Sequence, residues 1–544
     1  MVLLCILAMG CEGVVGDTPI RPGEGDDLPE GVVLPAPHTR ASRLTHAQWE
    51  RTVQDLFGLD GPTGLSGSFR TDSLPGSSTF DNPGGDLVVD QVLWPSYQSA
   101  AADVADMATN DPAILGRIAP DTGNPETFIR DFGMLAHRRP LTDDEVTEYV
   151  NVFETAAGLY GPLDERTSGV RLVLEAMLQS PHFLYRVEQS AERDGRLIPL
   201  DGYEIASRLS YALWNSMPDE ELFAAAAAGM LSDPEAVATQ ARRMLDDPRA
   251  HDVVVDFHRQ LFDVESYAAI SPSEMDFPDA DPNLGQYAMR EHDLFVEEIV
   301  FGRDGDYREL LTSSDTFVNE ELARIYEVSG TFSADEFELV SLDETRRRGV
   351  FTQVGFLAAN ATSRLPDPIH RGVFIAERIA CVHIESPPDD TPAPAPEPGL
   401  TNRGTIELHT EQPGSVCAGC HAQIINPFGW PFENFDAIGM WQTIDNDQPI
   451  DPTGSPPIDG VPTPVENAAQ LADVLSDSTY AHECYVRHWI EYALGRPAEP
   501  EDQALVADLG LRSRDGELSV KELLVQLVSS RAFLTRSTEE VSGP

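Results

Sequence analysis

The amino-acid sequence predicts an all-α, multi-domain fold made of bundle-like helical modules. Apolar residues recur at helical spacing in most readable segments, whereas runs that alternate polar and apolar residues are few. The chain has 544 residues, 41% of them apolar, so it has ample core material but is too long for a single core. Typical domain sizes suggest about three or four domains.

Four capping boxes mark where helices begin. In this motif an N-cap side chain and a side chain three residues later satisfy each other's backbone N–H groups. The pairs are Thr45 with Gln48, Thr142 with Glu145, Asp201 with Glu204, and Ser519 with Glu522. An apolar stripe follows each pair, and further stripes at 170–178 and 486–494 predict two more helices. We interpret these stripes as core-facing surfaces.

The first eleven residues have the pattern of an export signal. A short apolar run ends at Gly10-Cys11 and is too short to span a bilayer. Residues 7–11 resemble a bacterial lipobox, in which Cys11 is lipidated, although no Lys or Arg precedes the run and Ala8 stands where leucine is usual. We expect export to the periplasm or outer membrane with a lipid anchor. Plain secretion and a chance apolar start are the alternatives.

The net charge of −54 argues against nucleic acid as a partner. Acidic residues are spread along the chain rather than held in one tail, so a phosphate backbone would be repelled.

One motif carries specific chemistry, Cys417-Ala418-Gly419-Cys420-His421. Two thiols with this spacing can form thioethers with the two haem vinyl groups, and the adjacent histidine then becomes the proximal iron ligand. We therefore expect one covalently bound haem c on Cys417, Cys420 and His421. The rivals are a zinc half-site, for which no second pair is evident, and a thioredoxin-like redox pair, which does not need the histidine.

The remaining cysteines suggest a disulfide. Of the six cysteines, Cys5 lies in the signal, Cys11 in the lipobox and two in the haem motif, which leaves Cys381 and Cys484. In an oxidising compartment a bridge between these two is the natural hypothesis, and two buried free thiols are the alternative.

The residues after the motif suggest how a haem could be held. A backbone carbonyl near Pro427 is expected to accept the Nδ1 proton of His421 and fix its tautomer. Five aromatic residues follow, which either wall the porphyrin or fill a small core: Phe428, Trp430, Phe432, Phe435 and Trp441.

The motif and its surroundings resemble a known family. The segment "CAGCHAQIINPFGWPFENFDAIGMW" is similar to the haem-binding part of planctomycete and myxobacterial cytochrome c-like proteins, a multi-domain family of domains of unknown function. Further segments resemble its other modules in family order: "RLTHAQWERTVQDLFGL", "AHRRPLTDDEV", "LDGYEIASRLSYALWNSMPDEEL", "RRGVFTQVGFLAANATSRLPDPIHRGVFIAERIAC", and "CYVRHWIEYALGRP" with "SVKELLVQLVSSRAFL". The family has no established substrate.

Proline- and glycine-rich linkers at 386–400 and 449–464 and the motif groups divide the chain. We expect a signal with lipobox at 1–11, a linker at 12–39, an N-terminal module at 40–110, a second at 125–190, a third at 197–322, a fourth with the haem motif at 335–445, and a C-terminal module at 465–537.

The sixth iron ligand has three candidates. Met440 follows the proximal histidine by 19 residues, and a thioether there would raise the reduction potential. The family commonly reads Gly-x-Trp-Arg where this chain has Gly439-Met440-Trp441-Gln442, so Met440 is a local feature. His409 matches a histidine found upstream of the motif in the family. An open site, or His482 or His488, is the third possibility.

These observations predict an exported electron-transfer protein with an unknown redox partner. The alternatives are a haem enzyme, such as a peroxidase or oxidase acting on an extracellular polymer, and a binding or scaffold module with structural haem. None of the many carboxylates has a spacing that identifies it as an acid/base catalyst.

Overall fold

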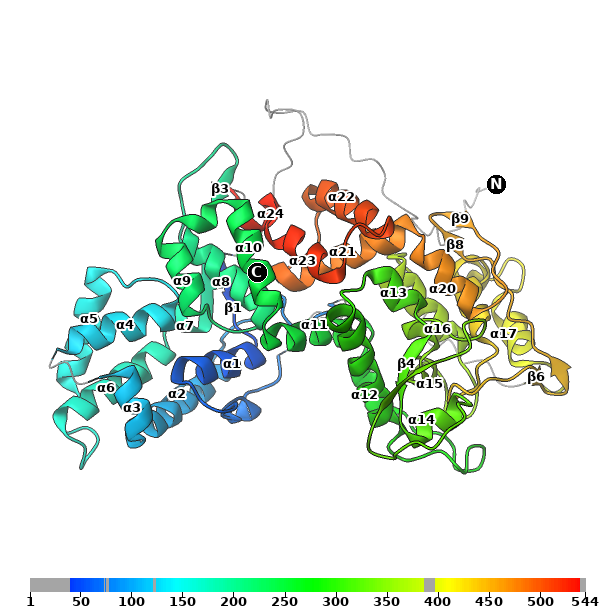
Figure 1. Ribbon diagram of the computed structural model, residues 1–544, viewed down its shortest axis with the longest axis horizontal. Helices are drawn as coiled ribbons and strands as arrows, with labels where there is room; N and C mark the ends of the chain where they lie inside the picture. Colours follow the sequence, from blue (N-terminus) through cyan, green and yellow to red (C-terminus); the bar gives the residue numbers. More distant parts are fainter. Residues whose placement is uncertain (1–39, 73, 75–77, 121–123, 386–396, 539–544) are drawn as a thin grey trace, which may run out of the picture. The chain divides into compact units, whose positions relative to one another are not determined.

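The computed structural model describes residues 40–72, 74, 78–120, 124–385 and 397–538 (Figure 1). The all-α prediction is confirmed, because helices dominate and the strands occur only as short antiparallel pairs in this part of the chain. None of its helices is long and apolar enough to cross a membrane. The expected signal and lipobox, with Cys11, and the linker at 12–39 lie outside the described residues.

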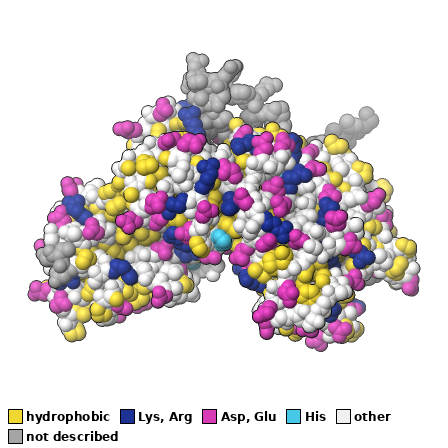
Figure 2. All heavy atoms as spheres, viewed as in Figure 1, with side chains coloured by type: hydrophobic (Ala, Val, Ile, Leu, Met, Phe, Trp, Pro, Cys, Tyr) yellow, Lys and Arg dark blue, Asp and Glu magenta, His cyan; other side chains and the backbone are white. Residues whose placement is uncertain are grey.

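The chain forms two compact units. The motif unit comprises residues 255–486 and 505–523, and the N-terminal unit comprises residues 31–254, 487–504 and 524–544, as far as these are described. The five expected modules are a finer division and stay a prediction. On the face shown in Figure 2, acidic side chains are scattered among basic and apolar ones rather than gathered in one patch.

The N-terminal unit is a helical assembly with two small strand pairs. Its helices are α1 (His46–Phe57), α2 (Leu93–Asn110), α3 (Pro112–Ile118), α4 (Pro125–His137), α5 (Asp143–Thr155), α6 (Glu165–Leu178), α7 (Pro181–Leu184), α8 (Gly202–Trp214), α9 (Glu220–Ala227), α10 (Pro234–Leu245) and α24 (Arg531–Leu534), with short turns η1 (Leu65–Ser68), η2 (Met230–Ser232) and η9 (Pro500–Asp502). Strand β1 (Ala41–Arg43) pairs with β2 (Tyr185–Val187), and β3 (Leu197–Pro199) pairs with β10 (Thr535–Ser537).

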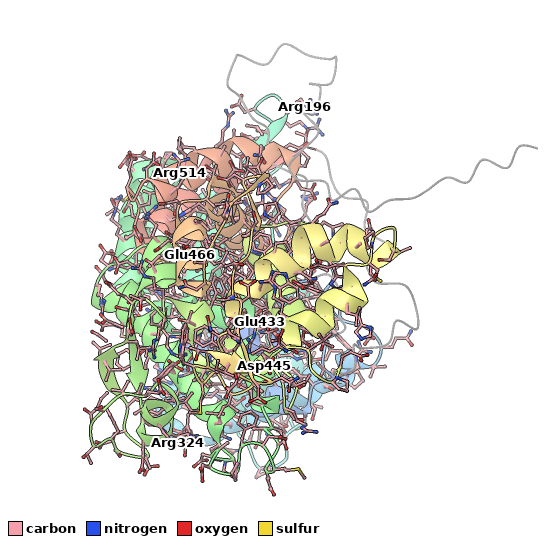
Figure 3. The ribbon with its side chains drawn as sticks, turned by 90° about the vertical axis from the view of Figure 1, so that its right-hand side faces the viewer. Arg196, Arg324, Glu433, Asp445, Glu466 and Arg514 are labelled. Carbon is pink, nitrogen blue, oxygen red and sulfur yellow. A yellow bond between two sulfur atoms is a disulfide. The ribbon has the colours of Figure 1, made fainter. Side chains whose placement is uncertain are left out.

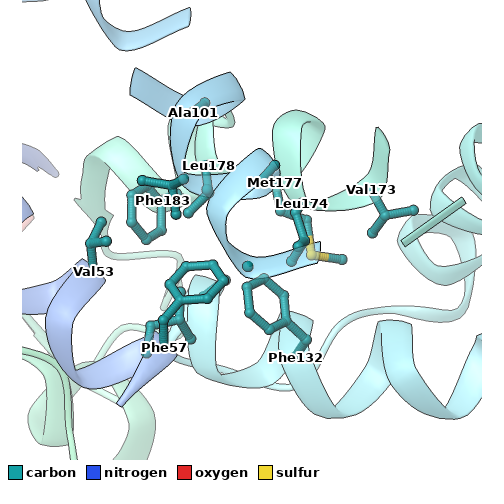
Figure 4. Close-up of a cluster of buried hydrophobic side chains, with 14 of the residues drawn as sticks. Val53, Phe57, Ala101, Phe132, Val173, Leu174, Met177, Leu178 and Phe183 are labelled. Atoms are coloured by element: carbon teal, nitrogen blue, oxygen red, sulfur yellow. The ribbon is translucent and has the colours of Figure 1, made fainter. Parts of the chain in front are cut away.

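The core of this unit contains the apolar stripes that the sequence predicted. Side chains from α1, α4, α6 and α7 meet in one cluster, which includes Val53, Phe57, Phe132, Leu174 and Phe183 (Figure 4). The capping boxes of α1, α5 and α8 are all formed.

The motif unit is assembled from shorter helices. They are η3 (Val264–Ala269), α12 (Leu284–Glu297), η4 (Glu298–Gly302), α13 (Tyr307–Thr312), α14 (Glu320–Ile325), η5 (Val350–Thr352), α15 (Val354–Ala359), α16 (Pro368–Phe374), η6 (Ile375–Ile379), α17 (Asn402–Thr410), α18 (Val416–Cys420), η7 (His421–Ile425), α19 (Asn426–Gly429), η8 (Trp430–Phe432) and α20 (Ala468–Ser476). Four helices contain a boundary between the units: α11 (Pro248–Leu261), α21 (Thr479–Leu494), α22 (Gln503–Arg514) and α23 (Val520–Val528).

Three hairpin-like strand pairs belong to the motif unit. They are β4 (Asp315–Val318) with β5 (Glu338–Ser341), β6 (Ile444–Asp445) with β7 (Gln448–Pro449), and β8 (Pro457–Ile458) with β9 (Val461–Pro462). The segment 449–464, which was expected to be a linker, therefore contains two-residue strands rather than a helix.

Helices α16 and α19 cross at close range because each contributes a glycine. A Cβ atom on Gly372 would lie 2.1 Å from the carbonyl oxygen of Ile425, and one on Gly429 would lie 2.0 Å from that of Pro368. Neither position has room for a side chain. This contact fixes the segment that directly follows the Cys-x-x-Cys-His motif.

Candidate functional site

The Cys-x-x-Cys-His motif begins a run of short helical turns in the motif unit. Ser415 caps α18 by accepting a hydrogen bond from the backbone N–H of Ala418 at 3.2 Å. Cys417 and Cys420 lie on α18, and His421 begins the π-helical turn η7, which leads into α19 at Asn426. The chain is therefore helical from Cys417 to Asn426.

His421 is held by a side chain and not by the backbone. Its Nδ1 atom lies 3.1 Å from Oδ1 of Asn426, a residue that is completely buried at the start of α19. This corrects the expectation that a carbonyl near Pro427 would be the partner. The π-helical turn accounts for the difference, since it brings residues five apart in sequence onto neighbouring positions.

The Asn426 side chain is in turn anchored at the end of α17. Its Nδ2 atom donates to Oγ1 of Thr410 at 3.1 Å and to Oε1 of Glu411 at 2.7 Å. Thr410 uses its own hydroxyl proton on the carbonyl of Ile406, at 2.8 Å, so its oxygen can only accept from Asn426. An ionised Glu411 carboxylate also only accepts.

These two acceptors determine which way the Asn426 amide points. With the NH₂ group toward Thr410 and Glu411, Oδ1 must face His421, and the reverse orientation would place oxygen against oxygen. An oxygen at Nδ1 requires that Nδ1 carries the proton of the neutral imidazole. The lone pair of His421 is then on Nε2, to which no other described residue forms a hydrogen bond or an ion pair.

The two cysteines of the motif are half-buried, and neither is part of a disulfide. Two large apolar side chains upstream of Cys417 are exposed: Val416, which directly precedes it, at 68%, and Leu408, on α17, at 45%. Exposed large apolar side chains can mark a surface that another group covers.

The aromatic residues that follow the motif are largely core. Phe428, Trp430, Phe432 and Phe435 are at most 3% exposed, while Trp441 is half-buried. Phe432 packs on Phe356 of α15 with ring centroids 5.6 Å apart. This arrangement fits the interpretation that they fill a small core.

Arg371 of α16 holds the chain downstream of the motif. It is fully buried, and its guanidinium donates to four carbonyl oxygens at 2.8–3.2 Å, which belong to Leu357, Phe432, Phe435 and Asp436. Burial lowers the pKa of Arg371 to about 10, so it stays charged at neutral pH. The hydrogen bonds of Arg371 and the glycine contact between α16 and α19 together anchor the residues that follow the motif.

Glu433 lies beside this arginine network. Its side chain is 3% exposed and accepts one hydrogen bond from Nδ2 of Asn402, at 3.2 Å. Burial raises the pKa of Glu433 to about 7, against the lowering effects of the Asn402 hydrogen bond and the Arg371 charge, and the nearby Asp445 carboxylate adds a smaller upward contribution. Figure 3 shows Glu433 and Asp445 next to the helices around the motif.

The candidates for a sixth ligand are dispersed in the structure. The Met440 sulfur lies 3.9 Å from a guanidinium nitrogen of Arg324 on α14, and Figures 1 and 3 show α14 and Arg324 apart from α17. His409 is exposed on α17, with Nε2 3.7 Å from Oε1 of Glu397. The ligand roles of Met440 and His409 stay predictions.

The other two histidines have different surroundings. His482 is buried, with one ring nitrogen 2.8 Å from Oγ of Ser513 and the other 3.0 Å from the carbonyl of Ser476. Both of its nitrogens therefore have partners in the motif unit. His488 belongs to the N-terminal unit.

Cys381 and Cys484 form a disulfide, which is the pair expected from the cysteine count. The bridge joins residues 103 apart in sequence within the motif unit, with Cα atoms 5.6 Å apart. The segment that it closes contains the whole Cys-x-x-Cys-His motif.

An open cavity of about 520 Å³ is lined in part by residues of α17. Its wall combines apolar side chains, including Leu365 and Ile406, with polar ones such as Asn402 and Asp445. A volume in this range suits a small organic molecule.

Sequence reasoning identified the motif but missed the residues that hold it. Asn426 follows His421 by five residues, which is a detectable signal only if the turn is known to be π-helical. Glu411 and Arg371 carry no local signal, because their partners come from other segments of the chain.

Five protein families match successive segments of the chain. Their descriptions are Protein of unknown function (DUF1587) at residues 42–110, (DUF1595) at 125–188, (DUF1592) at 200–328, (DUF1588) at 347–445 and (DUF1585) at 463–533. The segment with the Cys-x-x-Cys-His motif falls in the fourth match, whose short name is PSCyt3. No curated protein and no solved structure matches the chain. The series of matches is consistent with the multi-domain family that the sequence resembles.

Proposed function

We propose that this chain, whose segments match five families of unknown function in series, is an exported c-type haem protein that transfers electrons to or from a partner still to be identified. The observation that carries the proposal is the hydrogen bond between Nδ1 of His421 and Oδ1 of Asn426. It fixes the tautomer that leaves Nε2 available to a metal, directly next to two cysteines with the spacing that haem attachment needs.

The surroundings of the motif fit a porphyrin. Cys417 and Cys420 are outside any disulfide and partly accessible, and the apolar Leu408 and Val416 offer exposed surface for an apolar ring to cover. Cys417 and Cys420 would hold the group through thioethers, and His421 would bind its iron. A bound haem would supply a one-electron Fe(III)/Fe(II) couple.

Two further observations support export. The pair Cys381 and Cys484 is bridged, and disulfides persist chiefly in oxidising compartments. The lipobox-like start, with Cys11 as the lipidated residue, would tether the mature chain to the outer membrane in the periplasm.

Intact mass spectrometry tests the proposal. The full chain, coexpressed with a cytochrome c maturation system, should gain the mass of one haem and keep it after acid-acetone extraction. Cys417→Ala with Cys420→Ala should lose that mass, whereas Cys381→Ala with Cys484→Ala, which also removes two cysteines, should keep it. A wild-type chain without haem under these conditions would contradict the proposal.

A haem enzyme is the second candidate, and the cavity against α17 is the observation that favours it. With Met440 held at Arg324 and His409 near Glu397, an exchangeable sixth position would be open to a substrate. Absorption spectra separate the two functions. A low-spin spectrum that ignores peroxide supports electron transfer, and a high-spin spectrum that changes with peroxide supports an enzyme.

A further inference from the structure

We infer that Asn426 is the positioning residue of His421 and that Glu411, acting through the Asn426 amide, makes the iron-facing nitrogen of His421 more basic and lowers the reduction potential of the haem. This inference deepens the proposed function and, in its second part, rests on it.

The positioning role follows from the way the Asn426 side chain is held. All three polar contacts of its amide are directional, at 3.1, 3.1 and 2.7 Å, and the residue is completely buried. Rotation of the amide would break two donor contacts and leave buried polar groups without hydrogen-bond partners, which is unfavourable. The oxygen that faces His421 is therefore fixed in place before any metal binds.

The electronic role follows from the charge of Glu411. A hydrogen bond from an amide to a carboxylate is about twice as strong as one between neutral groups. Donation from Nδ2 to Glu411 polarises the amide, so Oδ1 of Asn426 becomes a better acceptor for the Nδ1 proton. A proton drawn away from Nδ1 leaves more electron density on Nε2, and a more basic ligand stabilises ferric iron relative to ferrous iron.

The contacts also connect the ligand to α17. Thr410 and Glu411 stand at the C-terminal end of that helix, and no described residue other than Asn426 links them to His421. The same helix carries Asn402, Thr405 and Ile406 on the cavity wall. Asn426 is thus the point at which α17 and the haem ligand meet.

Potentiometry of the loaded protein tests the electronic role. Glu411→Gln keeps an acceptor oxygen for Asn426 but removes the charge, so we expect the equilibrium constant for reduction to rise on the order of tenfold, which is about 59 mV for one electron. Glu407→Gln is the matched control, since Glu407 lies on the same helix and pairs with Arg403 at 2.7 Å rather than with Asn426. Equal shifts in both variants, or no shift in Glu411→Gln, would overturn the electronic role.

Nitrogen-15 NMR of the haem-free chain tests the positioning role without any haem. The neutral imidazole of His421 should carry its proton on Nδ1 in the wild type and in Glu411→Gln, and should lose this preference in Asn426→Leu. A wild-type His421 protonated on Nε2 would refute the positioning role even if haem attaches. A wild type that shows the Nδ1 tautomer but never binds haem would leave the positioning role standing and overturn only the proposed function.

Discussion

Replacement of Glu433 by glutamine should stabilise the motif unit at alkaline pH and not at acid pH. Glu433 is 3% exposed, and burial raises its pKa to about 7 from the ordinary value of 4.5. Because the folded-state pKa is the higher one, the protonated form adds stability that is fully present below pH 4.5 and is lost as the pH rises through about 7. At pH 8.5 the folded unit therefore holds a buried carboxylate that the unfolded chain would leave in water.

The size of this effect follows from the shift. A difference of about 2.5 pKa units at 1.36 kcal/mol each corresponds to about 3 kcal/mol. The buried carboxylate destabilises the folded unit by this amount at pH 8.5, and this destabilisation is absent at pH 4.5. Glutamine has nearly the same shape, keeps an oxygen for Asn402 and cannot ionise. Glu433→Gln should therefore gain most of these 3 kcal/mol at pH 8.5.

Urea unfolding at both pH values measures this prediction, with hydrogen exchange of peptides from residues 426–441 as the probe of the motif unit. Glu466→Gln is the control, because Glu466 is an exposed glutamate of the same unit (Figure 3) and should change stability little at either pH. Equal effects of Glu433→Gln at pH 4.5 and pH 8.5 would refute the reasoning.

Three further perturbations should have separable effects. Cys381→Ser with Cys484→Ser opens a loop of 103 residues and should cost about 4.7 kcal/mol in the chain-entropy model, as measured by urea unfolding. Gly429→Ala places a Cβ atom 2.0 Å from the carbonyl oxygen of Pro368 and should destabilise the motif unit by about 3 kcal/mol, seen as faster exchange in α19. Burial lowers the pKa of His137 to about 3. Between pH 6.5 and pH 3 only the unfolded chain takes up this proton, so the free energy of unfolding of the N-terminal unit should fall by about 5 kcal/mol over that range. His137→Phe should flatten this dependence on pH.

Each of these three predictions has a control variant or an outcome that would contradict it. Native protein with two alkylatable thiols would show that the bridge between Cys381 and Cys484 does not form. Gly116→Ala, where a Cβ atom meets no neighbour within 4 Å and alanine favours the helix α3, should not destabilise the protein. His251→Phe should keep the acid dependence of the wild type, and an unaltered slope in His137→Phe would contradict the assignment.

The sequence predicted those features that depend on neighbours along the chain. The capping boxes at Thr45, Thr142 and Asp201 are local, and all three helices begin where their pattern indicates. The Cys-x-x-Cys-His spacing is equally local. By contrast, the partner of His421 depends on a π-helical turn, which no residue pattern signals, and the acceptors of the Asn426 amide lie on another helix.

The position of Met440 also depends on tertiary contacts that the local sequence does not reveal. A separation of 19 residues is compatible with an approach to His421, because loop residues can carry a side chain a long way. Tertiary packing places the sulfur at Arg324 instead, since Arg347 binds the carbonyl of Gly439 and Asp436 accepts from the Met440 N–H at 2.8 Å. These contacts come from three separate segments and have no signature in the sequence.

The bridge between Cys381 and Cys484 has a consequence for biogenesis. On the proposed function, the four cysteines of the motif unit would need opposite fates in one compartment, because one pair is bridged while Cys417 and Cys420 would have to remain thiols until the vinyl groups react. An oxidant able to form the bridge would also be able to close the Cys-x-x-Cys pair. Haem attachment would therefore require a thiol reductant that acts on Cys417 and Cys420 and spares the long-range bridge, in which Cys484 is buried and Cys381 is exposed.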